Sequence, residues 1–259
     1  MLPSIFIVPG FYEGPRVFDP LVAVLRTAGF ESIHTATIKS TGTIPPGNPT
    51  MDDDIAALAI ELASLVEEAG DRGVVAIFHS AGGFLGSAAM KGLSVEARKL
   101  SGKAGGVRAI VFLAAGVLLE GAEQESWPFM EVNVCSSQFA AMDDVGVTKL
   151  TCQVSNGTQT CRNPMDLLFH DFPSMETHKW LELIQHQPVN WGTTLNYCGW
   201  REVPSTYIIC EADRLLPMEL QEQMASLASS RKVRLPNAGH MAQLSHVHEV
   251  AVAVREACQ

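Results

Sequence analysis

Short apolar runs alternate along the first half of the chain with segments whose apolar residues recur at helical spacing. The runs SIFIV, VVAIF and VRAIVFLAA begin at residues 4, 74 and 107. Their length and their flanking turn residues predict buried strands. Thr50 is a good N-cap residue for a helix whose apolar positions are Ile55, Leu58, Leu62 and Leu65. Strands that alternate with helices predict a parallel sheet with helices on both faces.

The alternation breaks down in the middle of the chain and resumes near its end. Helices are predicted over residues 17–28 and 95–100, and strands over residues 32–38 and 205–210 and in the run RKVRL. Residues 117–200 instead contain a hairpin signal, a helical patch over residues 175–186 and many aromatic side chains. We therefore expect an α/β core of residues 1–116 and 201–259, with residues 117–200 inserted as a cap over one edge of the sheet.

Ser80 follows a predicted strand inside the sequence FHSAGG, where the chain must turn sharply into a helix. Such a turn holds the serine backbone in a strained conformation, raises its hydroxyl above the sheet and directs the next N–H toward a substrate oxygen. Gly82 and Gly83 supply the small residues that this turn needs, whereas Phe78 stands where the GxSxG pattern has its first glycine. The sequence indicates a nucleophile, with an ordinary strand-to-helix turn as the alternative.

A serine nucleophile needs a base and an orienting acid, and both occur downstream. Glu211 and Asp213 follow the predicted strand 205–210, and His240 follows the turn residues Asn-Ala-Gly. The order Ser, Asp, His is that of α/β-hydrolases rather than of chymotrypsin or subtilisin. Right-handed crossovers between parallel strands would bring these strand ends to one edge of the sheet.

The N-terminal strand ends at Pro9-Gly10 and opens into the loop FYEGP. In a hydrolase of this type, that loop and the residue after the nucleophile each supply one oxyanion donor. The candidate donors are the backbone N–H groups of Phe11 and Ala81. Taken alone, the loop also fits a plain glycine-rich turn.

The chain resembles, over nearly its whole length, the hydroxynitrile lyase and plant methylesterase group of α/β-hydrolases, which includes the salicylate-binding esterases. The resemblance rests on VPGF, FHSAGG, LFHDFP, QHQPVNWGTT, ICEADRLLP and AGHMAQLSHVHEV. It implies the α/β-hydrolase fold, a mostly parallel, doubly wound sheet with an inserted cap. It also implies a triad of Ser80, Asp213 and His240, with backbone oxyanion donors at Phe11 and Ala81.

Met241 distinguishes two activities within this group. The lyases carry a lysine directly after the catalytic histidine, which stabilises departing cyanide, and this chain has a thioether there. We therefore expect hydrolysis of a carboxylic ester or lactone through an acyl-enzyme. The alternatives are a lyase or cyclisation enzyme that uses the same triad as a general base, and a ligand-binding receptor on this fold.

The aromatic and methionine residues of the expected cap predict an apolar pocket, although many of them would form the cap's own small core. The candidate pocket residues are Tyr12, Trp127, Phe139 and Met241. Such a pocket suits a hydrophobic small-molecule ester or lactone. The proposed chemistry requires no cofactor, and the scattered histidines and cysteines suggest no metal site.

Composition narrows the range of partners. The chain has 259 residues, 47% hydrophobic residues and a formal net charge of −10. An acidic chain without a basic cluster is a poor candidate for nucleic acid or anionic membranes. The N-terminus lacks a charged leader region, so a cytoplasmic location is expected. These features leave a monomer and a homodimer both open.

A hairpin signal in the sequence predicts that two cysteines lie opposite each other on paired strands. Asn156-Gly157 predicts a two-residue turn that pairs Ser155 with Thr158 and, further out, Cys152 with Cys161. This last pair falls at a non-hydrogen-bonded position, where side chains approach most closely. A disulfide is therefore geometrically feasible, whereas a reducing cytosol would leave two thiols.

Overall fold

A computed structural model describes residues 2–123, 152–172, 174–189 and 191–259. Its centre is a six-stranded sheet in the order β2-β1-β3-β4-β8-β9, and every pairing in this sheet is parallel. The strands are β1 (Ser4–Val8), β2 (Ile33–Thr35), β3 (Val74–His79), β4 (Val107–Leu113), β8 (Ser205–Cys210) and β9 (Arg231–Leu235). The predicted mostly parallel α/β architecture is confirmed.

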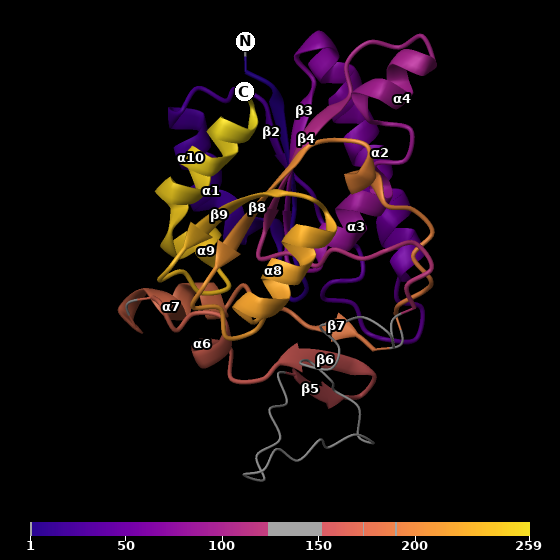
Figure 1. The fold of residues 1–259 in the computed structure, drawn as a ribbon. Helices are drawn as coiled ribbons and strands as arrows, with labels where there is room; N and C mark the ends of the chain where they lie inside the picture. Colours follow the sequence, from indigo (N-terminus) through magenta and orange to yellow (C-terminus); the bar gives the residue numbers. More distant parts are fainter. Residues whose placement is uncertain (1, 124–151, 173, 190) are drawn as a thin grey trace.

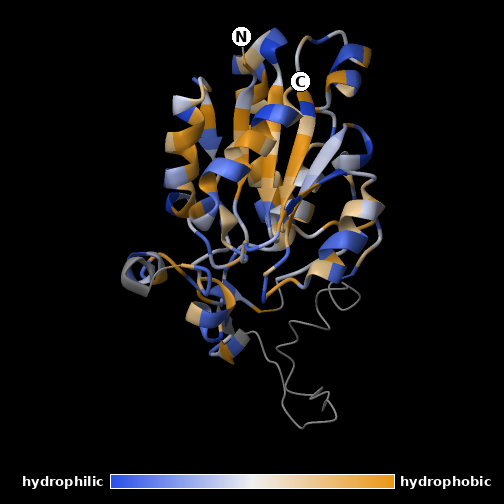
Figure 2. Cartoon of the chain, turned by 60° about the vertical axis from the view of Figure 1, so that its left-hand side comes forward, coloured by the Kyte–Doolittle hydropathy of each residue, from blue (hydrophilic) through white to orange (hydrophobic). Residues whose placement is uncertain are grey.

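Two apolar layers cover the two faces of the sheet. One layer contains side chains of α2 (Met51–Ala69), α3 (Gly82–Ala89) and α8 (Met218–Leu227), and the other contains side chains of α1 (Asp19–Thr27) and α10 (Val247–Ala257). Alternate residues of β1 belong to opposite layers: Phe6 and Val8 to the first, Ile5 and Ile7 to the second. Figure 2 shows the apolar strands between helices whose outer faces are more polar. This is the doubly wound arrangement, with the core on both sides of the sheet.

The strand order changes direction between β1 and β3. The chain passes from β1 outward to β2 and then returns to β3 on the other side of β1. In doubly wound sheets, the crevice at such a switch point lies at the carboxyl ends of the strands and is the usual ligand site. The loop after β1 and Ser80 after β3 meet at this point.

The helix starts follow local sequence. Thr50 accepts a hydrogen bond from Asp53 N–H and the Asp53 carboxylate accepts one from Thr50 N–H, so α2 begins with a reciprocal capping box. The predicted helix 17–28 is instead divided into a 3₁₀ turn, η1 (Pro15–Phe18), and α1. Pro20 explains the division, because proline has no N–H to donate to the preceding turn.

Two elements are shorter in the structure than the sequence predicted. The edge strand β2 spans three residues, and α7 (Ser174–Leu181) ends before residue 186. The remaining elements are η2 (Gly70–Arg72), α4 (Val95–Leu100), α6 (Pro164–Leu167), η4 (Gly199–Arg201) and α9 (Ala242–Ser245). Within the described ranges, no helix combines the length and the apolar character needed to cross a bilayer.

Residues 117–200, here called the insertion, include a second, antiparallel sheet of β5 (Cys152–Ser155), β6 (Thr158–Cys161) and β7 (Gln187–Pro188). Its register pairs Ser155 with Thr158 and Cys152 with Cys161, as the turn predicted. Cys161 is buried and carries a free thiol in this structure. Figure 1 places this sheet, with α6 and α7, at the end of the molecule opposite the two termini.

A buried polar network ties the insertion to the core. The Asp54 carboxylate accepts hydrogen bonds from Ser40 N–H at 2.8 Å, the Ser40 hydroxyl at 2.5 Å and the Trp191 indole N–H at 2.7 Å. The Gln187 side chain donates to the same Ser40 hydroxyl at 2.6 Å. Burial raises the pKa of Asp54, and the hydrogen bonds oppose that shift. One carboxylate thus fixes α2, the loop after β2 and the insertion to one another.

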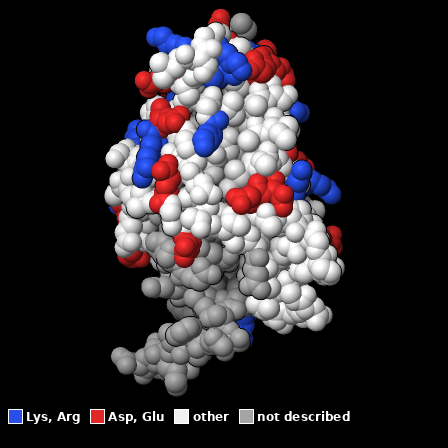
Figure 3. Space-filling model, turned by 90° about the vertical axis from the view of Figure 1, so that its right-hand side faces the viewer, with Lys and Arg blue, Asp and Glu red and all other residues white. Residues whose placement is uncertain are grey.

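Charged side chains of both signs are interspersed on the face shown in Figure 3. No single-sign field of the kind that steers nucleic acid covers the described part of that face.

Candidate active site

Ser80 has the strained backbone that the turn after β3 predicts. Its φ is +50°, which non-glycine residues seldom adopt and which costs about 1–3 kcal/mol. Ser80 N–H donates to Leu113 C=O, and Ser80 C=O accepts from Gly83 N–H at 3.0 Å and Gly116 N–H at 2.8 Å. The turn is therefore held from β4 and α3 together, and the strain persists because the surroundings fix it.

Close packing explains the small residues around Ser80. A Cβ on Gly82 would lie 2.5 Å from the carbonyl oxygens of Val8 and Pro9, and one on Gly10 would lie 2.5 Å from Ser80 Cβ. Phe78, which replaces the first glycine of the usual pattern, packs its ring against Gly86, where any Cβ would overlap that ring. The space that Phe78 needs is thus provided by a glycine of α3, which the sequence pattern did not reveal.

His240 and Asp213 form a buried hydrogen-bonded pair. His240 Nδ1 lies 2.7 Å from Asp213 Oδ2, and the two residues are 2% and 7% exposed. The other oxygen of Asp213 accepts from Leu215 and Leu216 N–H at 2.8 and 2.9 Å. Because the carboxylate only accepts, Nδ1 of a neutral His240 carries the proton and Nε2 is free to take one.

The pKa of His240 reflects two opposing effects. Burial alone would lower this pKa, but the charge and hydrogen bond of Asp213, together with the charges of Glu13 and Asp171, raise it above its usual value. A histidine with a raised pKa is a stronger base when it is neutral. It is also protonated over more of the acidic range.

Glu211, the other candidate acid, points elsewhere. Its Oε1 lies 2.7 Å from the guanidinium of Arg234 in an exposed ion pair. The structure therefore brings Asp213, and not Glu211, to His240.

His79 links the segments of Ser80 and His240. His79, which precedes Ser80, has its ring centroid 4.8 Å from that of His240. The Ser80 hydroxyl makes no hydrogen bond to His240 within the described residues. In unliganded sites this contact is often long and tightens only around substrate.

The two candidate oxyanion donors lie in the segments next to Ser80. Within the described residues, the backbone N–H groups of Phe11 and Ala81 have no hydrogen-bond acceptor, whereas Gly10 N–H donates to Glu13 Oε2 at 2.8 Å. The near contact between Gly10 and Ser80 places the loop of Phe11 beside the nucleophile. Two free N–H groups next to a serine are what a developing oxyanion needs.

Aromatic side chains gather beside this loop. The Phe11 ring lies 5.1 Å from Trp191 and 6.3 Å from both Phe84 and Tyr12, centroid to centroid. Tyr12 is 8% exposed and has a φ of +69°, and Met241 is fully buried with its sulfur accepting from the Gln243 amide. That Tyr12 and Met241 line a substrate pocket stays a prediction. The predicted pocket residues Trp127 and Phe139 lie outside the described residues.

Two acidic residues near His240 were not assigned from the sequence. Asp171 Oδ2 accepts from Gly239 N–H at 2.7 Å and from the Ser245 hydroxyl at 2.6 Å, so the insertion holds the loop of His240. Asp171 lies in the stretch LFHDFP, on which the family resemblance partly rests, but the sequence assigned no role to this residue. Glu13 Oε2 lies 2.9 Å from His79 Nδ1, and no sequence signal joins residues so far apart.

Glu13, His79 and His240 also form the one described group whose ligand atoms suit a metal, all within 4.8 Å of one another. The group is already occupied by hydrogen bonds. Glu13 is bonded to His79, and His240 Nδ1 is bonded to Asp213. A metal would have to replace these contacts.

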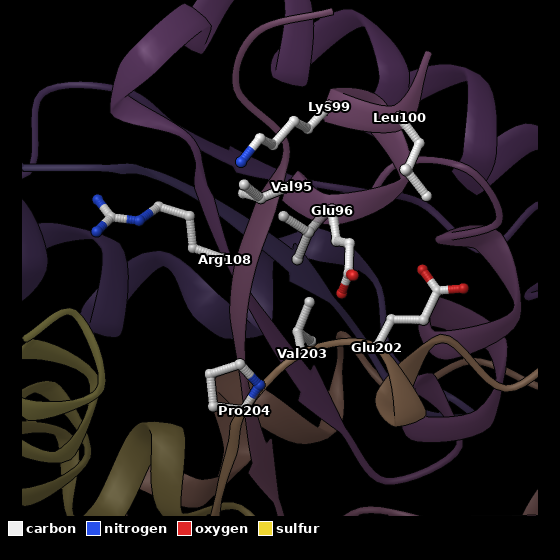
Figure 4. A pocket seen from close by; sticks show the side chains of 9 residues that line it. Val95, Glu96, Lys99, Leu100, Arg108, Glu202, Val203 and Pro204 are labelled. Carbon is white, nitrogen blue, oxygen red and sulfur yellow. The ribbon is translucent and has the colours of Figure 1, made fainter. Parts of the chain in front are cut away.

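A separate pocket lies at the opposite end of the sheet, between α4, the start of β4 and the segment before β8 (Figure 4). Its wall includes Lys99, Arg108, Glu96 and Glu202. It contains none of the residues around Ser80.

Comparison with known proteins identifies the family of the chain. The sequence model of the alpha/beta hydrolase family matches residues 5–254. The "Alpha/beta hydrolase nvfD" of Aspergillus novofumigatus is 28% identical over 229 residues, which cover 86% of this chain and 83% of that protein. A probable hydrolase of a Phoma species is 22% identical over 98% of this chain and 97% of its own length.

Solved structures of similar fold cover almost the whole chain. Polyneuridine aldehyde esterase has a TM-score of 0.70 at 20% identity, with 98% of both chains covered. A pyrethroid hydrolase from Sphingobium faniae has a TM-score of 0.66 at 19% identity, covering 99% of this chain and 97% of its own. Tomato methylketone synthase I with 2-tridecanone has a TM-score of 0.70 at 15% identity, covering 99% and 98%. At these identities the likeness establishes the fold.

The first prediction separates the two carboxylates. Asp213→Asn would present the wrong imidazole tautomer and lower kcat for an activated ester by about 10⁴-fold. Glu211→Gln, the matched control on the same loop, would lower kcat less than about tenfold, because only a surface ion pair is lost. Steady-state kinetics of both variants test this. A larger loss with Glu211→Gln would refute the assignment of Asp213.

The second prediction concerns pH. His240 must be neutral to act as a base, so kcat/KM should rise with pH through an apparent pKa above the ordinary histidine value of about 6.5. Asp171→Asn keeps an oxygen for Gly239 N–H but removes a negative charge. This change should lower the apparent pKa and extend activity to more acidic solution. The control Asp166→Asn, at an exposed ion pair, should leave the profile unchanged. An unshifted profile in Asp171→Asn would contradict the electrostatic account.

Proposed function

Because the chain belongs to the alpha/beta hydrolase family and has the α/β-hydrolase fold, we propose that it is a serine hydrolase that cleaves a hydrophobic carboxylic ester or lactone. The observation that carries the proposal is the buried His240–Asp213 pair beside a serine held at φ +50°. A strained serine next to a histidine and carboxylate pair is the arrangement of an activated nucleophile.

The proposed reaction proceeds by acyl transfer. Ser80 Oγ attacks the carbonyl carbon of the ester while its proton passes to His240 Nε2. The carbonyl oxygen becomes an oxyanion, which accepts hydrogen bonds from Phe11 and Ala81 N–H. The intermediate collapses, His240 gives its proton to the departing alcohol, and an acyl-enzyme remains on Ser80.

Water completes the cycle. His240 takes a proton from a water molecule that attacks the acyl carbon, and the acid leaves as the proton returns to Ser80. Asp213 holds the imidazole tautomer and stabilises the imidazolium formed in both halves. Each oxyanion donor supplies about 3 kcal/mol of transition-state stabilisation. The chain itself supplies the nucleophile, base and donors, so the proposed reaction requires no cofactor.

The aromatic side chains around the loop of Phe11 support the proposed substrate class. An aromatic cluster of Phe11, Phe84 and Trp191 stands beside the candidate oxyanion donors, and Trp191 is anchored by Asp54. A rigid apolar wall next to the reacting carbonyl favours esters with a hydrophobic group over small polar ones. We propose that the chain belongs to the methylesterase-like group of this family. We also propose that it has no nucleic acid or membrane partner and that it is located in the cytoplasm.

Non-hydrolytic chemistry is the alternative use of the same residues. Methylketone synthase I shares the fold, so the fold alone is compatible with synthesis as well as with hydrolysis. Cyanohydrin cleavage is disfavoured by Met241, because a buried thioether cannot stabilise a departing cyanide as an ammonium would.

The third prediction tests hydrolysis against cyanohydrin cleavage. The protein should hydrolyse p-nitrophenyl butyrate, and Ser80→Ala should lower kcat by at least about 10⁴-fold. Ser101→Ala, at an exposed serine after α4, is the matched control and should keep full activity. The wild-type protein should release no cyanide from mandelonitrile above background, and Met241→Lys should gain at most a trace.

Efficient cyanide release by the wild type would overturn both the Met241 argument and the esterase proposal. Ester turnover that survives in Ser80→Ala would refute Ser80 as the nucleophile.

A further inference from the structure

A buried acid and base pair beside the proposed triad takes no part in the reaction described above. Glu13 and His79 are 3% and 0% exposed, and Glu13 Oε2 lies 2.9 Å from His79 Nδ1. Such a pair is costly to bury unless further hydrogen bonds satisfy its polar atoms.

The pair connects all three segments on which the proposed chemistry depends. Glu13 Oε2 also accepts Gly10 N–H at 2.8 Å, one residue before the oxyanion donor Phe11. His79 directly precedes Ser80, and its Nε2 lies 2.9 Å from the backbone oxygen of His240. The oxyanion loop, the nucleophile turn and the base are therefore joined by one side-chain bridge.

Both ring nitrogens of His79 take part in this bridge. The His240 carbonyl oxygen can only accept, so His79 Nε2 carries a hydrogen and donates it. On the other side, a single oxygen of Glu13 faces both Gly10 N–H and His79 Nδ1. One carboxyl oxygen thus joins the backbone of the oxyanion loop to the ring of the residue that precedes the nucleophile.

Both members of the pair are fixed in place. The Phe18 ring packs edge-on against His79 at 5.9 Å, and the Glu13 backbone forms a bridge with Ile184 of the insertion. The next contact, from Gln185 N–H to Tyr12 C=O at 2.8 Å, holds the same loop. The Glu13 carboxylate therefore has little freedom to find other partners.

We propose that Glu13 is a positioning residue of this enzyme, which joins the loop of Phe11 to His79 and so fixes that loop and His240 relative to Ser80. The proposal rests on the proposed hydrolase function. Without the Glu13 carboxyl group, Gly10 N–H and His79 Nδ1 lose the oxygen that they share. The oxyanion loop and the His79 ring are then no longer held together, and the catalytic groups move apart.

The test is Glu13→Gln, which keeps the size of the side chain and removes its charge. With p-nitrophenyl butyrate, kcat should fall about 10- to 100-fold, the effect of a small misplacement of catalytic groups, while KM changes less than about threefold. The matched control is Glu61→Gln, because Glu61 pairs with His34 at 2.7 Å in a half-buried Glu–His pair away from Ser80. The control should keep kcat within about twofold, as expected for a surface pair.

A second measurement follows the hydrogen bond between His79 and His240 directly. In the wild-type protein, nitrogen-15 NMR of the histidine rings should show that the Nε2 hydrogen of His79, identified by the contact of its ring with Phe18, exchanges slowly with solvent. In folded Glu13→Gln the same hydrogen should exchange faster.

The outcomes separate this proposal from the proposed function. Wild-type protein that turns over no ester and forms no Ser80 adduct would refute the hydrolase function, and the positioning role with it. Active wild type with an unchanged kcat in Glu13→Gln, or with an unchanged exchange rate of the His79 Nε2 hydrogen in that variant, would overturn the role of Glu13 alone.

Discussion

The left-handed backbone of Ser80 is the constraint on which the rest of the site depends. A side chain at φ +50° is tolerated only because three elements approach the turn closely. The carbonyl oxygens of Val8 and Pro9 leave no room for a side chain at Gly82, and Gly10 lies against Ser80 itself. The same contacts that hold the serine in this conformation therefore place the loop of Phe11 beside it. The nucleophile and the oxyanion donors are products of one packing arrangement.

His240 is fixed from three directions by three different carboxylates. Asp213 binds its ring, Glu13 reaches its carbonyl through His79, and Asp171 binds the N–H of the preceding Gly239. Each carboxylate comes from a different part of the chain, and Asp171 belongs to the insertion. Because all three are negative, they also raise the pKa of His240 against the effect of burial. The same three carboxylates thus determine both the position and the basicity of the proposed base. The insertion contributes to both through Asp171.

The sequence was sufficient for the framework and for residues at strand ends. Apolar runs and the cap at Thr50 predicted the parallel sheet and α2, and the Asn156-Gly157 turn predicted the register of the hairpin. Strand-end position likewise indicated Ser80, Asp213 and His240, since strand order determines which ends meet. Contacts between distant side chains were not predictable. Nothing in the pattern around Phe78 indicates that Gly86 makes room for its ring, and nothing near residue 13 indicates His79 as its partner.

Covalent trapping with a serine-directed probe shows whether Ser80 is an activated nucleophile. The folded protein is treated with a fluorophosphonate probe, and the adduct is located by peptide mass spectrometry. We expect one adduct per chain, on Ser80, with labelling much slower in Asp213→Asn and absent from the unfolded protein. An adduct on another residue, or equal labelling of folded and unfolded chains, would contradict an activated serine at this turn.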